Sequence, residues 1–212
     1  MTVSYTHLAD YKKIFQKFLP YVDIFVPSLE ETVLMLDREE YMRIVEKADG
    51  HDFVKTADLT ILPRLGQTLI DMGVKVLVIK CGSKGYYLKT AGEDSISKIG
   101  LDSSSFANRE LFEETFHVEN IKSTTGAGDV SIAAFLASII RGYGIEDCAR
   151  EACATASLTI QKSDVFSGIR PLEETLEIVK TWERDPVSLP DGWSYEPNEK
   201  IWFSTEDSKY TK

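Results

Sequence analysis

The stretch Ser123-Thr124-Thr125-Gly126-Ala127-Gly128-Asp129 decides the fold of this chain, because it leads directly into an apolar segment that predicts a helix over 130–141. Glycines before a helix start leave backbone N–H groups open to an anion, and the helix dipole adds partial positive charge there. Asp129 would place a carboxylate beside a bound phosphate. The pattern indicates a phosphate-binding turn that carries a base, although a simple capping turn would use the same residue types. No Gly-Lys-Ser/Thr closes it, so it is not a Walker-type loop.

Residues 124–129 resemble the C-terminal signature of the ribokinase-like, or PfkB, carbohydrate kinases at all six positions. In the order expected of that family, 23–31 resembles its strand ending in Pro-Asn-x-x-Glu, and 74–88 resembles its strand, Gly-x-x-Gly turn and strand. Residues 147–171 resemble its Ala-rich nucleotide-side helix and the loop that follows. The likeness covers about residues 8 to 182. The family's N-terminal half, with its first strands, sugar-binding residues and lid, has no counterpart here.

The expected fold is therefore α/β, a ribokinase-like three-layer α/β/α arrangement without that N-terminal half and lid. A short apolar strand is predicted over 24–26, and the almost unbroken apolar run 74–79 predicts a strand covered on both faces. Gly82 and Gly85 bracket a turn into 86–88, which predicts a hairpin. Because helical segments alternate with the strands, we expect a mostly parallel sheet with this hairpin.

Helical spacing and end signals predict helices over 8–18, from 28 onward, and over 56–72, 130–141, 145–161 and 171–182. Residues 1–182 are accordingly read as the C-terminal part of a kinase domain, truncated relative to the family. Residues 183–212 form a separate extension that contains Pro and aromatic residues. Its prolines exclude a regular helix, and its aromatic content is too high for a solvated tail. It packs over the domain's own surface or serves as a partner-binding arm.

Composition is that of one globular domain, with 43% hydrophobic and 27% charged residues in a chain of 212. The formal net charge of −10 argues against a nucleic-acid partner. Cys81, Cys148 and Cys153 are odd in number and lack metal-ligand spacing, so reduced thiols and a cytoplasmic location are expected. Met1 is followed by polar residues, so no signal peptide is expected. The helix after Asp129 is shorter than the ~20 residues that span a bilayer, so no membrane partner is expected.

The resemblance implies a role for each residue of the turn. In these kinases the aspartate aligned with Asp129 removes the proton from an acceptor hydroxyl as it attacks the γ-phosphate of ATP. The N–H groups of Gly126, Ala127 and Gly128 would hold the charge that develops on the transferred group. The implied reaction is transfer of the γ-phosphate to a hydroxyl of a sugar or similar polyol.

The same resemblance places a set of residues along the nucleotide. Gly82 would allow close backbone approach, although a plain hairpin turn explains the glycines equally well. Cys153 stands where many relatives carry Asn, in a helix of small residues that close helix packing would also explain. The full set of expected nucleotide contacts is Thr125, Lys80, Gly82, Gly85, Cys153 and Ala156.

Glu31 matches the family's acidic position near Mg²⁺ and its waters, and Mg²⁺ prefers one or two carboxylates plus phosphate oxygens. Ser28-Leu29-Glu30-Glu31 is also a capping box, in which each end satisfies the other's backbone N–H. Both interpretations stay open. The family commonly has Asp where Ser123 stands, and this departure argues against activation by a monovalent cation.

Two functions follow from these patterns. The first is an ATP-dependent sugar kinase of the PfkB type, incomplete as given. The second is a catalytically inactive relic of that family, which binds nucleotide or a protein partner. Missing strands would expose a sheet edge and apolar surface, so we expect a homo-oligomer or a missing N-terminal half as partner.

Overall fold

The computed structural model describes residues 10–210, and the start of the helix predicted over 8–18 lies outside them. The sheet in this part of the chain has six strands. The strands are β1 (Ile24–Phe25), β2 (Val76–Lys80), β3 (Gly85–Thr90), β4 (Glu110–Glu114), β5 (Trp193–Glu196) and β6 (Ile201–Ser204). The α-helices are α1 (Tyr11–Phe18), α2 (Leu29–Leu36), α3 (Arg38–Ala48), α4 (Phe53–Thr56), α5 (Leu62–Asp71), α6 (Glu93–Lys98), α7 (Ser103–Phe106), α8 (Ala127–Ile140), α9 (Ile145–Thr159) and α10 (Leu172–Ile178). The 3₁₀-helices are η2 (Leu19–Tyr21), η3 (Leu59–Ile61) and η4 (Gly82–Lys84).

The sheet order is β1-β2-β3-β4-β6-β5. Only β1 and β2 pair in parallel among the described strands, and the other four pairs are antiparallel. The prediction of a mostly parallel sheet is therefore wrong. The helical segment between β1 and β2 is a crossover that returns the strand in parallel, whereas β4 and β6 pair antiparallel although α8, α9 and α10 lie between them. The hairpin is confirmed, because β2 and β3 pair antiparallel around the turn η4.

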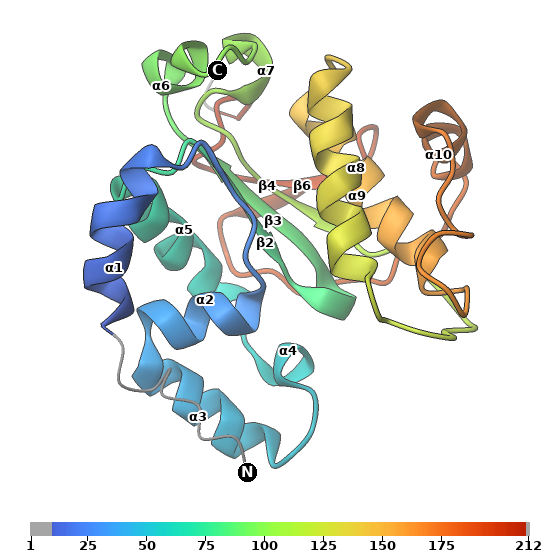
Figure 1. Ribbon diagram of the computed structural model, residues 1–212, viewed down its shortest axis with the longest axis horizontal. Helices are drawn as coiled ribbons and strands as arrows, with labels where there is room; N and C mark the ends of the chain where they lie inside the picture. The colour runs from blue at the N-terminus through green and yellow to red at the C-terminus, as the bar shows by residue number, and fades with distance from the viewer. Residues whose placement is uncertain (1–9, 211–212) are drawn as a thin grey trace.

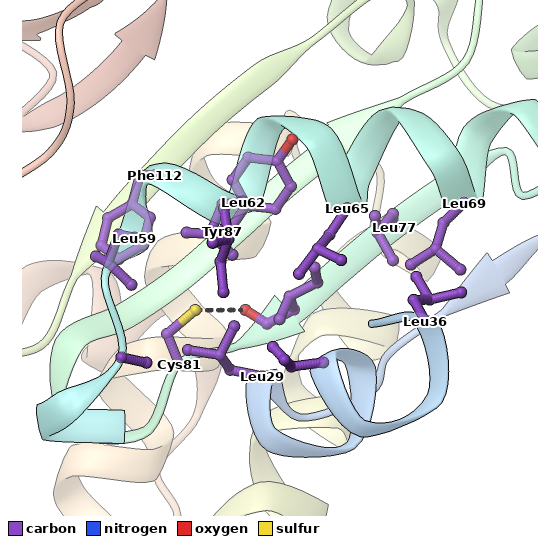
Figure 2. Packing of buried hydrophobic residues seen from close by; sticks show 14 of the residues in the cluster. Leu29, Leu36, Leu59, Leu62, Leu65, Leu69, Leu77, Cys81, Tyr87 and Phe112 are labelled. Carbon is purple, nitrogen blue, oxygen red and sulfur yellow. Dashed lines mark hydrogen bonds between the residues drawn. The ribbon is translucent and has the colours of Figure 1, made fainter. Parts of the chain in front are cut away.

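Both faces of the sheet are covered by helices (Figure 1). Side chains alternate along a strand, so Leu77 and Ile79 of β2 join one core while Val76 and Val78 join the other. The first core packs leucines of α2 and α5 against Tyr87 and the sheet (Figure 2). The second core lies under α8 and α9. Burial on both faces explains the unbroken apolar run in β2.

The helix predicted from residue 28 is divided in two. Ser28 caps α2, and α2 ends at Leu36. The Asp37 side chain then accepts a hydrogen bond from Glu40 N at 3.1 Å and caps α3. A second capping residue within an apolar-periodic segment thus ends one helix and starts another. None of the helices in residues 10–210 has the length and apolar character needed to cross a membrane.

The C-terminal segment extends the sheet. Strand β6 pairs with β4, and β5 pairs with β6 at the edge. Trp202 Nε1 donates to Glu114 Oε1 at 3.1 Å, and Val187 N donates to the same oxygen. Arg184 forms a buried ion pair with Glu113 of β4. The segment predicted as a separate extension therefore supplies two strands and the partners of buried carboxylates.

A second buried ion pair fastens the last described residues. Asp207 is fully buried and accepts from Arg109 Nε at 3.0 Å and from Glu110 N at 2.7 Å. The Arg109 guanidinium, itself 1% exposed, also donates to Glu146 Oε1 at 2.6 Å. These bonds join β4, the start of α9 and the segment around residue 207.

A buried carboxylate on α9 makes stability depend on pH. Glu151 is 0% exposed, and neither of its oxygens has a hydrogen-bond partner in the described part of the chain. Burial raises the pKa of Glu151 from 4.5 to about 8. The folded state then binds a proton that the unfolded state releases, so this group lowers stability progressively as pH rises from about 4.5 to about 8.

We therefore expect Glu151→Gln to stabilise the protein, because the amide needs no proton to stay neutral. The gain in free energy of unfolding should be larger at pH 8.5 than at pH 5.5 by about 2 kcal/mol. Urea unfolding at the two pH values measures it. Glu39→Gln, at an exposed site on α3, is the control. An equal gain at both pH values would contradict the assignment.

Candidate active site

The turn before α8 has the geometry of an anion-binding site. Gly126 is the N-cap, with φ of +78°, and a Cβ there would lie 2.6 Å from Val165 Cγ1, so only glycine fits. Ala127 N–H donates to Thr124 O at 3.3 Å. Within the described residues, the N–H groups of Gly126, Gly128 and Asp129 have no protein acceptor. Three donors and the helix dipole thus lie at one point.

Lys80 brings a positive charge to this turn. It is the last residue of β2, and its Nζ lies 3.4 Å from where a Cβ on Gly128 would stand. Lys80 N donates to Pro27 O at 2.9 Å, so the end of β1 and the end of β2 lie together. Lys80 and the glycine turn, predicted separately from sequence, are therefore neighbours in space.

Glu31 lies on the same side, at the start of α2. Its Oε2 accepts hydrogen bonds from Ser28 N at 2.9 Å and from Ser28 Oγ at 2.8 Å, and Glu31 N donates to Ser28 Oγ at 3.2 Å. The capping box is thus formed. The bonds from Ser28, and then the charge of Lys80, hold the pKa of Glu31 below its usual value. Oε1 takes part in neither bond from Ser28, and the carboxylate is exposed.

Asp129 is exposed in the first turn of α8. Next to this turn lies an open groove of about 560 Å³, lined mainly by apolar side chains. Among the described residues that line it, Glu31 is the one with a charge, and Ile132, one turn after Asp129, is part of its wall. The carboxylate of Asp129 is thus accessible to a molecule bound beside α8.

Two predicted nucleotide residues lie in the hairpin turn. Gly82 is exposed in η4 with φ of +52°. Gly85 is buried, and a Cβ there would lie 2.0 Å from Glu113 O, so strand packing alone requires glycine. Of these two glycines, only Gly82 presents its backbone to solvent.

The remaining predicted nucleotide residues differ in their access to solvent. Cys153 is fully buried, and its Sγ donates to Glu114 O at 3.3 Å, so the thiol lies against β4. Ala156, three residues further along α9, is half-buried. Thr125 is exposed, and its N–H donates to Ser123 Oγ at 3.3 Å. The Cys153 side chain is not on a surface that a nucleotide could reach.

Ser131, which was not identified from the sequence, lies directly behind the turn. Its Oγ donates to Gly128 O at 2.7 Å, and the residue is 1% exposed. A serine in a mainly apolar helix, two positions after Asp129, is the signal that could have identified it, although Ser138 of the same helix carries the same signal. Val165, which closes over Gly126, carries no comparable signal.

Comparison with known proteins identifies the protein family to which this chain belongs. The family model described as pfkB family carbohydrate kinase matches residues 2–170, and the chain belongs to this family. The resemblance seen in the sequence is confirmed. Ribokinase of Arabidopsis thaliana is 30% identical over 109 residues, which cover 51% of this chain and 25% of that protein. A protein of Archaeoglobus fulgidus named as an uncharacterized sugar kinase is 25% identical over 154 residues, covering 73% and 46% of the two chains.

Solved structures share the fold. Arabidopsis thaliana ribokinase complexed with ribose and ATP has a TM-score of 0.56 and 23% identity, covering 78% of this chain and 43% of that chain. A putative ribokinase II from E. coli in complex with ATP and Mg²⁺ has a TM-score of 0.55 and 20% identity, covering 80% and 42%. The ribokinase-like fold is thus confirmed. The chain spans less than half the length of these relatives.

Proposed function

We propose that this chain is the ATP-binding part of a PfkB-type kinase that transfers the γ-phosphate of ATP to a hydroxyl of a sugar or polyol. The observation that carries this proposal is the convergence of Lys80 with the N–H groups of the turn before α8. Such a cluster of fixed donors binds phosphate and stabilises the charge that develops during its transfer. Asp129, accessible in the same turn, supplies a carboxylate for the acceptor hydroxyl.

Each residue then has a separate task. Lys80 and the free N–H groups hold the phosphate oxygens, and Asp129 takes the proton of the attacking hydroxyl. The exposed Oε1 of Glu31 fits Mg²⁺, which accepts one carboxylate together with phosphate oxygens and waters. When bound, Mg²⁺ neutralises negative charge on the phosphates. Glu31 can serve as cap and metal ligand together, because its two bonds from Ser28 use Oε2.

Lys80→Gln tests the phosphate site directly. The amide removes the charge and shortens the side chain by one atom, so ATP should bind about tenfold more weakly or worse. Adenosine, which has no phosphates, should bind as before. Calorimetry with both molecules measures the two affinities, and Lys98→Gln, an exposed change on α6, is the control. An equal loss of affinity for ATP and for adenosine would contradict a contact between Lys80 and the phosphates.

A second proposal concerns the acceptor site. Beside β1, apolar side chains of two helices lie open to solvent: Ile14 and Phe18 of α1 are 49% and 50% exposed, and Leu136 and Ile140 of α8 are 37% and 84% exposed. β1 pairs only with β2 among the described strands, so its outer edge is open. Monomers rarely expose so much apolar surface around an unpaired strand edge.

We propose that β–α units from the part of the family that this chain does not match cover this face and supply the acceptor-binding residues. The surface of these units that contacts this chain must offer a strand edge to β1 and apolar side chains to α1 and α8. Light scattering of the 212-residue chain tests this. Association of the chain alone, lost when Ile140 is changed to Asp, supports an apolar docking face. A monomer that stays soluble at high concentration would count against it.

A further inference from the structure

The loop that follows α9 is tied to the segment that leads into the phosphate-binding turn, and the two lie side by side (Figure 1). The consecutive backbone N–H groups of Lys122 and Ser123 both donate to Ile160 O, at 2.8 and 3.3 Å. At the far end of the loop, Gly168 is buried so close to α9 that a Cβ on it would lie 2.7 Å from a backbone oxygen of that helix. The loop 160–168 is therefore fixed at both ends beside the turn.

One carboxylate orders the middle of this loop. Asp164 accepts hydrogen bonds from Phe166 N at 2.9 Å and from Ser167 N and Ser167 Oγ, both at 2.7 Å. Ile169 N then donates to Phe166 O at 3.0 Å. A carboxylate that accepts from the backbone two and three residues further on closes a tight turn, so the residue between Asp164 and Phe166 keeps a fixed direction.

The residue in that position is Val165. It is half-buried, whereas the other residues of 163–167 are exposed. Its two methyl groups lie 2.6 and 2.9 Å from the point where a Cβ on Gly126 would stand, so they pack against the Cα of that glycine. A side chain branched at Cβ has few accessible rotamers, and the contact is therefore stiff. The loop thus places a rigid apolar group on the residue that caps α8.

Gly126 determines where the free N–H groups of the turn point. It adopts φ of +78°, and a glycine can leave such a conformation at little steric cost. A rotation there would turn its own N–H group away from those of Gly128 and Asp129. Donors stabilise a transferred phosphate best when they are oriented before the charge develops, so such freedom would weaken the site.

We propose that Val165 is a positioning residue for the phosphate-binding turn. Its methyl groups hold Gly126 in one conformation, so that the three free N–H groups of the turn face the phosphates of ATP before ATP binds. The loop 160–168, fixed at both ends and closed by Asp164, supplies the rigid support that this contact needs. This inference rests on the proposed kinase function of the same site.

Val165→Ala tests the contact, because it removes both methyl groups and leaves the backbone of the loop unchanged. We expect it to bind tripolyphosphate, a probe without base or sugar, about tenfold more weakly than the wild type. Val165→Thr keeps the branched shape and should bind tripolyphosphate as the wild type does. Calorimetry measures the three affinities.

Val187→Ala is the matched control. It makes the same change at another half-buried valine, which packs against the first core on the other face of the sheet. Loss of the two methyl groups should lower the melting temperature in both alanine variants. Only Val165→Ala should also weaken the binding of tripolyphosphate, which a purely structural role would leave unchanged.

Hydrogen exchange without ligand, followed by NMR at single amides, separates this inference from the kinase proposal. Two amides with backbone acceptors, those of Ala127 and Val130, report on the order of the turn. Both should exchange about tenfold faster in Val165→Ala, and at the wild-type rate in Val165→Thr and Val187→Ala.

If the wild type binds neither ATP nor tripolyphosphate, the kinase proposal fails, and faster exchange in Val165→Ala still supports the ordering of the turn. Unchanged exchange in Val165→Ala would overturn the inference. So would faster exchange with no loss of tripolyphosphate affinity in a chain that binds it, or equal effects of Val165→Ala and Val187→Ala on exchange and affinity.

Discussion

Asp129→Asn is expected to lower phosphoryl transfer by about 10²–10⁴-fold while ATP still binds, because the amide cannot accept the proton of the attacking hydroxyl. The substitution keeps the size of the side chain. The backbone N–H of residue 129, one of the three free donors of the turn, is also retained. The measurement is ATP-dependent phosphorylation of a panel of sugars and polyols, with ATP affinity determined by calorimetry on the same samples.

The outcomes separate the candidate functions. Activity in the wild type, with binding but no turnover in the variant, supports the base role of Asp129. Binding of ATP without turnover in both, also after co-expression with an N-terminal half of a relative, would favour a relic that binds nucleotide. Activity unaffected by the substitution would remove Asp129 from the mechanism and leave it as a first-turn helix residue.

Asp207→Ala is expected to destabilise the fold by about 3–5 kcal/mol, because it leaves the buried guanidinium of Arg109 with one carboxylate partner fewer and Glu110 N without its acceptor. Such a loss is a large fraction of the stability of an ordinary domain. Urea unfolding followed by circular dichroism measures it. Asp185→Ala is the control, since its ion pair with His117 is about half exposed and should contribute little.

A second variant separates charge from packing. Asp207→Asn keeps the shape of the side chain and one acceptor oxygen. Its free energy of unfolding should therefore lie between those of the wild type and Asp207→Ala. If Asp207→Ala and Asp185→Ala destabilise equally, the buried contacts of Asp207 do not fasten the sheet. A stability change confined to β5 and β6 in hydrogen exchange would also contradict a role in the whole fold.

The sequence predicted those elements whose signals are local. Val76–Lys80 is apolar throughout, and the turn at 124–129 matches a family signature, so both were identified. β4 was missed because three of its five residues are glutamates, which is atypical of a buried strand. Their partners include Arg184, Trp202 and Asp207, which lie 71, 88 and 97 positions further along the chain. No local sequence pattern predicts contacts between residues so far apart in the chain.

The candidate site, like the fold, could be predicted from the sequence only where its signals are local. The residues of the turn were found from their spacing, but the approach of Lys80 to Gly128 depends on where β2 ends relative to α8. The direction of the Cys153 side chain could not be predicted from the sequence either. A helix of small residues has several faces that could be buried, and packing against β4 selects the one that carries the thiol. The mixed direction of the strands was missed because β4 was not predicted and the returning segment at 193–204 carries no family motif.

The position of Asp207 has a consequence for synthesis on the ribosome. Arg109 emerges almost a hundred residues before the carboxylate that neutralises it, and β4 emerges well before the strand that covers its edge. Until residue 207 has left the exit tunnel, the central sheet has an unpaired edge and a buried cation short of a partner. The phosphate-binding turn is thus translated long before the sheet that supports it can close, and closure of the sheet waits for residue 207.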